Sequence, residues 1–486
     1  MDSQKNNNYL NYIDGQWVES SSGKIFQNTN PADESDLVGN FQLSNEVDAK
    51  RAVQAASQAF SAWKKLSISK RAAILNSAAK YLEDHAQEFA IELTREEGKP
   101  VNQAKDEILR SAQTIRFYAV EGQSYTGETF PQDDPDMMVF TIREPLGVVS
   151  VIAPWNFPIS IPARKIAPAL IMGNTVIFKP SSEAPLIGLR LIEAFVAAGI
   201  PKGVINFLTG NAGVVGPVIT QSPEIRAISF TGSTKIGQEI HRNASLSTRT
   251  QMELGGKNPL IVMEDADLDL AVDLTIKGGL SLSGQACTGT SRVLVMQPVL
   301  DEYTNKLLAK LKTLKIGNGL IPGMDMGPLA SAKQLASVMK FIEIGKSEAR
   351  LLIGGERLTG PDYDKGYYVA PTIFTDVTQN MEIARTEIFG PVISIMSVNS
   401  FEDAMQKAND SEYGLSAAIA TKNATYAHRF INEIESGTAK VNRTTTGNLI
   451  NAPFGGIKSS STATFRESGR GGLEFYTQIK TAYRGY

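Results

Sequence analysis

The sequence predicts an α/β fold with more than one packed core, and three observations lead to this prediction. The chain has 486 residues, more than one ordinary core holds, since domains average roughly 150 residues. Hydrophobic residues make up 42% and charged residues 20% of the chain, which are ordinary values for globular proteins. After Pro145, short apolar runs rich in strand formers alternate with helical segments, and this alternation favours parallel sheets covered by helices.

The N-terminal part predicts one hairpin followed by helices. "YIDGQWVE" (12–19) has strand-forming residues on both sides of Asp14-Gly15, a pair typical of hairpin turns. From Ser44 or Asn45, either of which can cap a helix, apolar residues recur at helical spacing up to Trp63. Further helices are expected over residues 69–84, 86–97 and 101–121.

Two series of apolar strands follow. The first is expected at 147–154, 175–180, 204–210 and 227–232, with an amphipathic helix over 185–199. The second is expected at 259–264, 291–297, 391–398 and 415–421, with a helix after Asp265. Each series predicts one α/β unit, and the two units meet near 253–258. The alternating, aromatic tail at 474–486 predicts an edge strand or a strand shared between subunits.

Charge and composition argue against several kinds of partner. The formal net charge is −3, and 48 basic residues are interspersed with 51 acidic ones, so no basic stripe indicates nucleic acid. No apolar run approaches the roughly 18 residues of a membrane span, and "MDSQKNNNYL" lacks the apolar core of a secretory signal. One cysteine excludes an internal disulfide, and three scattered histidines do not indicate a metal site. We therefore expect a cytoplasmic protein without a metal.

The one cysteine lies in "GQACTGTSR" (284–292). A lone cytosolic cysteine is usually a small buried hydrophobe. However, the small neighbours of Cys287, among them Gly284 and Gly289, leave room for a ligand at the sulfur. They also indicate a loop or helix start, whose N–H groups can hold an anion and lower the pKa of a thiol. Cys287 is thus a candidate nucleophile as well as a candidate core residue.

Two further segments carry groups suited to acyl chemistry. "ELGGKNP" (253–259) places Glu253 at the expected junction, as a general base or as a surface carboxylate paired with Lys257. "PWNFP" (154–158) ends a predicted strand and is either a rigid turn or a means of aiming the amide of Asn156 into a cleft. Open α/β sheets bind ligands beyond the carboxyl ends of their strands, where such an amide could hold an oxyanion.

Two strand-to-helix junctions are candidates for phosphate binding. In "FTGSTKIG" (230–237), Gly232 and Ser233 open a helix directly after a strand. The segment matches neither GxGxxG nor a Walker motif, which argues against an NTPase. Lys179, in "KPSSEAP" (179–185), either lies beside the same ligand or belongs to a solvated loop.

The order of these segments is more specific than any one of them. It continues with "EIFGPV" (387–392) and "PFGGIK" (453–458), and from about residue 10 to the C-terminus it resembles the aldehyde dehydrogenase superfamily. Details such as "SSSTATFRESG" (459–469) are most similar to the group that acts on 2-oxoglutarate semialdehyde or succinate semialdehyde. The resemblance implies oxidation of an aldehyde to a carboxylic acid with NAD or NADP.

The resemblance assigns the chemistry to three residues. Cys287 would attack the aldehyde, while the amide of Asn156 and the backbone N–H of Cys287 would hold the resulting oxyanion. Loss of hydride to the nicotinamide would leave a thioester, which water activated by Glu253 would hydrolyse. A thiolate suits these steps because it is both a soft nucleophile and a leaving group.

The resemblance also implies an aldehyde dehydrogenase-like α/β fold in three parts. A Rossmann-type dinucleotide-binding domain would comprise 1–125 and 146–253, a catalytic α/β domain 254–455, and a β oligomerisation arm 126–145 and 456–486. The oligomer would be a homodimer or homotetramer. Lys179 would contact the adenosine ribose, Ser233 the pyrophosphate and Glu387 the nicotinamide ribose. The full set of implied cofactor contacts is Trp155, Lys179, Ser182, Gly210, Gly232, Ser233, Glu387 and Phe389.

One departure from the family pattern bears on the cofactor. Members that prefer NAD usually have a glutamate three residues after the lysine, where it binds both ribose hydroxyls. Here that position is Ser182, and Glu183 follows it. A serine accepts a 2′-phosphate that a carboxylate would repel, so NADP is the expected cofactor and NAD the second one. A one-residue shift of the loop that brought Glu183 to the ribose would reverse this expectation.

The substrate is expected to be a carboxylated semialdehyde. Arg164 is polar within the apolar "SIPARKIAPAL" and matches an arginine that binds the distal carboxylate in the semialdehyde group; it could also be a solvated helix residue. A second family arginine, six residues before the cysteine, is Ser281 here. An alternative substrate is an aromatic or aliphatic aldehyde bound between Phe157 and Phe454. An alternative activity is that of a CoA-acylating enzyme, which the presence of Glu253 disfavours. The third alternative is a scaffold without catalytic activity.

Overall fold

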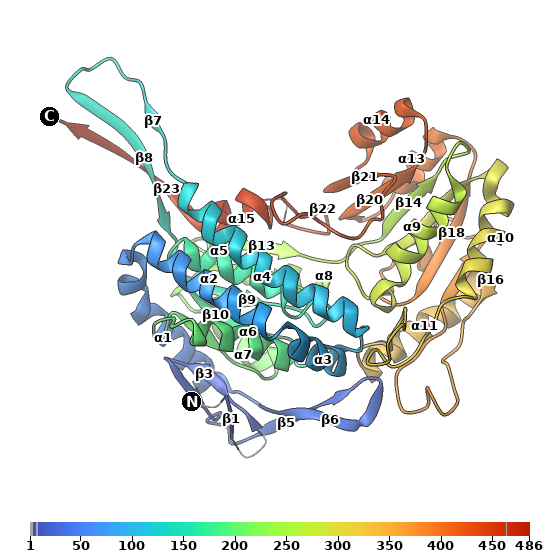
Figure 1. Ribbon diagram of the computed structural model, residues 1–486. Helices are drawn as coiled ribbons and strands as arrows, with labels where there is room; N and C mark the ends of the chain where they lie inside the picture. Colours follow the sequence, from blue (N-terminus) through green and yellow to red (C-terminus); the bar gives the residue numbers. More distant parts are fainter. Residues whose placement is uncertain (1–2, 6–7, 463) are drawn as a thin grey trace.

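The computed structural model describes residues 3–5, 8–462 and 464–486. Over these residues the strands form two seven-stranded sheets and three smaller sheets. Figure 1 shows the two large sheets in separate halves of the molecule, each with helices around it, and a long arm that projects beyond the first half. This arrangement confirms the predicted α/β class.

The first large sheet combines a parallel centre with an antiparallel edge. Its strands are β3 (Asn11–Ile13), β4 (Gln16–Val18), β9 (Val148–Ile152), β10 (Thr175–Lys179), β11 (Ile205–Phe207), β12 (Ile225–Thr231) and β13 (Arg249–Glu253). They lie in the order β13-β12-β9-β10-β11-β3-β4. The strands from β9 to β13 run parallel, and β3 and β4 form the hairpin at the edge.

Alternation along the strands of this sheet builds a core on each face. Val176 and Phe178 of β10 belong to one core, and Ile177 between them belongs to the other, as the two-residue period of a strand requires. The larger core also contains buried residues of α2 to α6, and the smaller one contains buried residues of α1 and α7. The helices of this half are α1 (Glu46–Lys65), α2 (Ile68–Asp84), α3 (Ala86–Glu97), α4 (Val101–Ser124), α5 (Ser160–Ile171), α6 (Pro185–Ala197), α7 (Ala212–Gln221) and α8 (Thr234–Asn243).

The second large sheet is parallel except at one edge. Its strands are β14 (Asn258–Val262), β15 (Thr290–Met296), β16 (Arg350–Ile353), β17 (Thr372–Thr375), β18 (Val392–Val398), β20 (Ser416–Ala420) and β21 (Thr438–Val441), in the order β16-β17-β18-β15-β14-β20-β21. Only the pairing of β16 with β17 is antiparallel among the described strands of this sheet.

Helices surround this second sheet, and it too has a core on each face. They are α9 (Leu268–Leu280), α10 (Leu300–Leu311), α11 (Ala332–Glu348), α12 (Glu382–Arg385), α13 (Phe401–Asn409) and α14 (Ala424–Glu433), with the 3₁₀ helices η1 (Ser281–Gly284) and η2 (Gln297–Val299). The chain crosses from the first sheet to the second between the end of β13 and the start of β14.

The arm consists of β7 (Thr129–Phe130), β8 (Met137–Pro145) and β23 (Thr477–Gly485). β23 pairs with β8 in antiparallel register from Thr477 opposite Pro145 to Gly485 opposite Met137, and it carries the C-terminus away from the body of the molecule (Figure 1). The preceding helix α15 (Gly469–Phe475) does not project, because its Leu473 and Phe475 are buried in the first core. Two small sheets remain. One has four strands, β1 (Gln4–Lys5), β2 (Asn8–Tyr9), β5 (Ile25–Asn30) and β6 (Asp33–Gln42), and the other has two, β19 (Tyr413–Gly414) and β22 (Ile457–Lys458).

The elements predicted from the sequence are confirmed, with small differences at their ends. The hairpin at Asp14-Gly15 is β3 and β4, and the tail is the edge strand β23. The cap of α1 is Asn45 rather than Ser44: its side chain accepts from the N–H of Asp48, whose carboxylate accepts from the N–H of Asn45. This reciprocal pair is a capping box.

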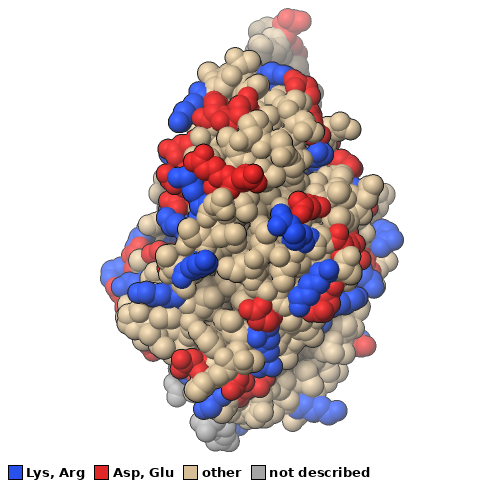
Figure 2. Space-filling view, turned by 90° about the vertical axis from the view of Figure 1, so that its right-hand side faces the viewer, with Lys and Arg blue, Asp and Glu red and all other residues tan. Residues whose placement is uncertain are grey.

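Charged side chains are interspersed on the surface. Figure 2, which shows the face beside the second sheet, has basic and acidic groups mixed across most of the view. In the part of the chain that the structure describes, no helix has the length and apolar character needed to span a bilayer.

Asn174 joins three parts of the first half. Its side-chain oxygen accepts hydrogen bonds from the N–H groups of Leu146 (2.8 Å) and Gly147 (3.0 Å), just before β9. Its side-chain nitrogen donates to the carbonyl oxygens of Ala169 (3.1 Å) and Tyr476 (3.0 Å), in α5 and just after α15. The residue is fully buried, so all four backbone groups depend on it.

We predict that Asn174→Ala lowers the free energy of unfolding by at least about 3 kcal/mol, because it leaves several buried backbone groups without partners. Urea denaturation followed by circular dichroism measures the change. The control is Asn211→Ala, which removes only the exposed cap of α7 and should cost about 1 kcal/mol. Equal costs for the two variants would contradict the role given to Asn174.

Candidate active site

The parallel strands of the first sheet bring distant residues to one edge. Asn156 follows β9, Lys179 ends β10, Gly232 and Ser233 follow β12, and Glu253 ends β13. Because the carboxyl ends of parallel strands meet at the same edge, side chains that are up to about a hundred residues apart become neighbours. Three of these strands, β9, β10 and β12, are short and mainly apolar, whereas β13 (RTQME) is mostly polar and pairs with β12 at the edge of the sheet.

A cleft of about 540 Å³ lies at this edge, between the two large sheets. The first half lines it with Trp155, Asn156, Lys179, Ser182, Gly232 and Ser233, and the second half with Cys287, Glu387 and Phe389. The rings of Trp155 and Phe389 meet edge to face across it, with centroids 5.4 Å apart. Nine of the residues predicted for the site therefore share one cavity, and the thiol of Cys287 is reached through it.

The polar groups of the cleft suit a dinucleotide. The N-terminus of α8 opens on it at Ser233, and the hydroxyl of Thr231 just before it is buried without a hydrogen-bond partner among the described residues. A helix N-terminus of this kind binds phosphate. Lys179 is only 3% exposed, and burial lowers its pKa to about 8. This burial excludes the alternative in which Lys179 belongs to a solvated loop.

Glu387 and Gly210 complete the set of predicted cofactor residues. A carboxylate oxygen of Glu387 accepts from the N–H of Gly256 at 3.0 Å, and burial raises the pKa of this carboxyl to about 7. Gly210 is not among the residues that line the cleft. Its carbonyl accepts a hydrogen bond from the hydroxyl of Ser182 at 3.4 Å, so it supports a residue of the cleft from behind.

The backbone before Cys287 is strained. Leu282 and Ser283 have φ of 55° and 54°, and Gly284 follows with φ of 72°. Non-glycine residues in the left-handed region cost roughly 1–3 kcal/mol each, so surrounding contacts must hold the loop in place. A side chain at position 284 is excluded, because its Cβ would lie 2.1 Å from the carbonyl oxygen of Gly390.

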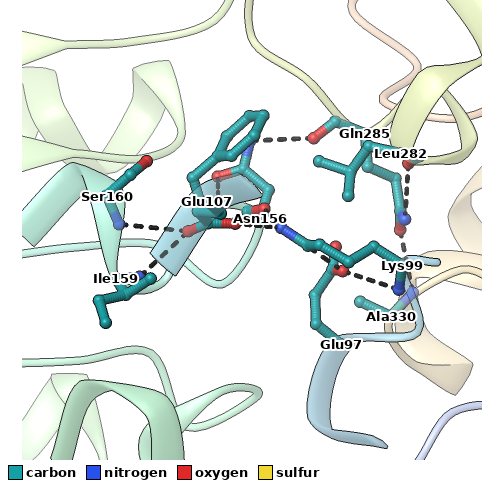
Figure 3. A network of polar contacts seen from close by, with 10 residues as sticks. Glu97, Lys99, Glu107, Asn156, Ile159, Ser160, Leu282, Gln285 and Ala330 are labelled. Carbon is teal, nitrogen blue, oxygen red and sulfur yellow. Dashed lines mark hydrogen bonds and ion pairs between the residues drawn. The ribbon is translucent and has the colours of Figure 1, made fainter. Parts of the chain in front are cut away.

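A polar network fixes this loop and the amide of Asn156 together (Figure 3). The amide nitrogen of Asn156 donates to the carbonyl oxygen of Gln285 at 2.9 Å, and the carbonyl oxygen of Asn156 accepts from the ammonium of Lys99 at 2.8 Å. The side chain of Gln285 accepts from the N–H of Ala330 (2.9 Å) and donates to the carbonyl oxygen of Leu282 (3.1 Å). Asn156 is therefore not merely part of a rigid turn, since its amide lies in the cleft next to the cysteine loop.

The far end of the same network is an ion cluster between α3, α4 and α5. Lys99 is paired with Glu107 and lies 3.8 Å from Glu97, and all three side chains are buried. Glu107 also accepts from the N–H groups of Ile159 (3.3 Å) and Ser160 (3.2 Å) at the start of α5. The cluster thus fixes the segment that carries Asn156.

The environment of Cys287 differs from the prediction of a lowered pKa. Burial raises the pKa of the Cys287 thiol to about 12; the positive charge of Arg164 opposes this, and three carboxylates, Glu387, Glu253 and Glu467, add to it. The prediction that nearby N–H groups lower this pKa is therefore wrong for this structure. The side chain is partly exposed and lines the cleft, so Cys287 is not simply a core residue either.

Glu253 is buried rather than paired at the surface. It is 3% exposed, and neither carboxylate oxygen has a hydrogen-bond partner among the described residues. Burial, and then the charge of Glu467, raises the pKa of Glu253 well above its usual value, while Lys165 and two arginines oppose the shift. The alternative pairing with Lys257 is wrong, because Lys257 is itself buried and its ammonium has no hydrogen bond within the described chain.

None of the three predicted substrate residues lines the large cleft, and two of them, Arg164 and Phe454, lie near Glu253. The guanidinium of Arg164 lies 5.7 Å from the ring centroid of Phe454 and 3.4 Å from Glu467. The neighbouring Gly455 lies against Glu253, since a Cβ added there would be 2.8 Å from its carboxylate oxygen. Phe157 lies elsewhere, with the ammonium of Lys99 4.7 Å above its ring.

Sequence reasoning missed the buried charges behind the site. Lys165 is fully buried and its ammonium lies 2.7 Å from Glu467 and 2.9 Å from the hydroxyl of Ser229. The sequence does contain a signal for this buried charge, namely a lysine next to an arginine in an apolar helix. A lysine in such a helix needs a buried partner, since lysine is almost never fully buried without one. Lys99 and Glu107 gave no such signal, because helix sequences contain many charged residues.

Two parallel sheets with a dinucleotide cleft between them, and a thiol in that cleft, define the class as an α/β oxidoreductase. The chain belongs to the aldehyde dehydrogenase family, whose model matches residues 17–482. It is 45% identical to the alpha-ketoglutaric semialdehyde dehydrogenase of Bacillus subtilis (strain 168) over 479 residues, which cover 98% of each chain.

Solved structures agree with this assignment. Betaine aldehyde dehydrogenase from Staphylococcus aureus, solved with NAD+, superposes with a TM-score of 0.95 at 33% identity, covering 98% of this chain and 95% of that one. An NADP-dependent enzyme of E. coli gives a TM-score of 0.94 at 35% identity and covers 98% of each chain. The protein is an NAD(P)-dependent aldehyde dehydrogenase.

We predict that alkylation of Cys287 by iodoacetamide in the protein without cofactor accelerates about tenfold per pH unit between pH 7 and 9. The raised pKa leaves the thiol protonated throughout this range, and only the small thiolate fraction reacts. Because the chain has one cysteine, loss of free thiol or the intact mass reports this site alone. The guanidine-unfolded protein is the control, and its rate should begin to level off near pH 8.5. A plateau below pH 8 in the folded protein would contradict the raised pKa.

Proposed function

We propose that Cys287 is the nucleophile of this dehydrogenase. The observation that carries the proposal is that its partly exposed sulfur lies in the same cleft as Asn156 and the dinucleotide-binding groups. Attack by the thiolate on the aldehyde carbon forms a C–S bond and an oxyanion. When the oxyanion collapses, hydride leaves the carbon and a thioester to Cys287 remains. The cofactor residues of the cleft would hold a nicotinamide dinucleotide, which would supply the acceptor for that hydride.

Asn156 has a free donor for the oxyanion. An amide nitrogen carries two N–H groups, and only one of them is engaged in the described part of the chain, by the carbonyl oxygen of Gln285. The second N–H and the backbone N–H of Cys287 form the proposed oxyanion site. Because the network around Lys99 and Gln285 holds the amide in place, little reorganisation accompanies the reaction.

Glu253 is the proposed base for hydrolysis of the thioester. It would take a proton from water as the water oxygen attacks the acyl carbon, and the C–S bond would then break to release the carboxylic acid and the thiolate. Lys165 and Glu467 lie in the same buried group of charges; Lys165 stabilises the ionised form of Glu253, and Glu467 destabilises it. A buried carboxylate with unpaired oxygens supports water rather than CoA as the acyl acceptor.

The proposed substrate is a carboxylated semialdehyde, with 2-oxoglutarate semialdehyde as the first candidate. Two findings support it: the printed name of the Bacillus subtilis relative at 45% identity, and the position of Arg164 beside Phe454 and close enough to Cys287 for its charge to act on the thiol. An arginine there offers a bidentate partner for the distal carboxylate. Oxidation of an uncharged aromatic or aliphatic aldehyde is the alternative.

NADP is the proposed preferred cofactor. Ser182 and Lys179 line the cleft together with Lys333, a cation that sequence reasoning missed. The carbonyl of Glu183 accepts from the side chain of Asn28 at 3.0 Å, which opposes a loop shift towards the ribose, and the charge of Lys333 acts on the Glu183 carboxyl. Ser182 is the proposed partner of a 2′-phosphate, while Glu183, which also lines the cleft, is held at its backbone by Asn28.

A homodimer or homotetramer assembled through the arm is the proposed quaternary state. β23 and β8 expose Ile142, Ile479 and Tyr483, which are 38%, 60% and 71% exposed. Large apolar side chains on a long projecting edge strand usually pair with another chain.

We predict that Glu253→Gln gives a burst of about one reduced cofactor per active site and then turns over at least about 100-fold more slowly than the wild type. The thioester still forms but lacks a base for its hydrolysis. Stopped-flow absorbance at 340 nm measures both phases.

Cys287→Ala is the control for this experiment and should show no burst, because it cannot form the thioester. Steady turnover of Glu253→Gln within twofold of the wild type would contradict the assignment of the base.

We predict that Ser182→Glu lowers the ratio of kcat/KM for NADP over NAD at least about tenfold, since a carboxylate would repel a 2′-phosphate at short range. Initial rates with both cofactors give the ratio. Ser182→Ala is the matched control, and its ratio should change less than about threefold because no charge is added. An unchanged ratio in Ser182→Glu would show that the 2′-phosphate binds elsewhere.

A further inference from the structure

We infer that Arg110 of α4 acts together with Arg164 of α5 to bind the distal carboxylate of the substrate. This inference deepens the proposed function and rests on it, because it names a second recognition residue in the same site. Arg110 could not be singled out from the sequence, because it lies in an amphipathic helix among other charged residues.

The packing of α4 against α5 places the two arginines near one another. Glu107 of α4 accepts hydrogen bonds from the N–H groups of Ile159 and Ser160 at the start of α5. Further along, Gly122 of α4 lies against Ile171 at the end of α5, where an added Cβ would be 2.5 Å away. The helices therefore run in the same direction, and Arg110, one turn after Glu107, lies level with the first turns of α5.

The charge of Arg110 has no counterpart in the protein. Its guanidinium forms no hydrogen bond or ion pair with any described residue, whereas Arg116 on the same helix is paired with Glu83 at 2.6 Å. Arg110 is exposed overall, but partial desolvation by its neighbours, and then the positive charge of Arg164, lower its pKa. Two cations that repel each other across a helix pair are stabilised when an anion binds between them.

The balance of charge around the arginines favours an anion. Arg110, Arg164 and Lys165 are the cations of this group, and Glu467 is the carboxylate paired with the last two. The pKa of the Glu253 carboxyl is raised, first by burial and then by the charge of Glu467. The cations of this group therefore outnumber its carboxylates, which favours the binding of an anion such as the distal carboxylate of a semialdehyde.

The position of the pair also fits the length of the substrate path. Arg164 contacts the ring of Phe454, and the next residue, Gly455, lies against Glu253. Arg164, but not Arg110, is among the charges that act on Cys287 and Glu253, so the exposed Arg110 is the more distant of the two arginines from the reacting groups. In this arrangement Arg110 supplies from α4 the second guanidinium that Ser281 cannot supply from the segment before Cys287.

The test compares two aldehydes of equal length, 2-oxoglutarate semialdehyde and pentanal, in the wild type and in Arg110→Gln. We expect the ratio of kcat/KM for the carboxylated over the uncharged aldehyde to fall roughly tenfold or more in Arg110→Gln, mainly through KM, the effect of losing one charge-assisted hydrogen bond. Arg110→Lys, which keeps the charge but not the bidentate geometry, should retain part of the preference. Arg116→Gln is the matched control on the same helix and should keep the wild-type ratio.

The outcomes separate this inference from the proposed function. If the wild type shows no preference for the carboxylated aldehyde, the proposed substrate class is wrong and the inference falls with it. If the wild type prefers it and Arg164→Gln loses the preference while Arg110→Gln stays within twofold of the wild-type ratio, the substrate class stands and the inference is overturned. Circular dichroism and the Kd for NADP, each compared with the wild type, establish that Arg110→Gln is folded.

Discussion

The hydrogen bond from the amide of Asn156 to the carbonyl oxygen of Gln285 is the constraint on which the site depends. It joins a loop of the first sheet to the strained loop of the second sheet that carries Cys287. Lys99 and Glu107 support it from behind, so helices α3, α4 and α5 share in holding the two loops in register (Figure 3). The relative position of the amide and the sulfur is therefore set by buried polar contacts rather than by either sheet alone.

Burial disfavours the ionised forms of both reactive groups of the site. It raises the pKa of Cys287 to about 12 and that of Glu253 well above its usual value, so at neutral pH the Cys287 thiol is protonated before the substrate and the dinucleotide bind. A thiol protected in this way reacts slowly with other electrophiles and oxidants, since the thiolate is the reactive species. The positive charge of Arg164 lowers the pKa of both groups. The residue proposed to bind the anionic end of the substrate therefore also affects the acidity of the nucleophile.

Much of the fold and the outline of the site could be predicted from the sequence, because they follow from local patterns. Apolar runs such as the one at Val176–Phe178 identify buried strands, and polar residues just after them identify the edge where ligands bind. The buried partners could not be predicted in this way. These partners are Lys99, Glu107 and Glu467. Each acts through contacts with residues more than fifty positions away, and in the sequence each resembles an ordinary solvated charge. The shift in the pKa of Cys287 was also beyond prediction, because it depends first on burial of the thiol in the folded chain and then on charges from separate segments.

The central claim is that the acyl group of the substrate is carried by Cys287. Mass spectrometry of the wild-type enzyme, quenched in acid during turnover of 2-oxoglutarate semialdehyde with NADP and digested with protease, tests it most directly. The account predicts an acyl adduct on the peptide that contains Cys287, which disappears when the aldehyde is exhausted. Two results would contradict this role of Cys287. One is formation of NADPH together with an adduct on another residue, and the other is formation of NADPH without any adduct under conditions that make hydrolysis rate-limiting.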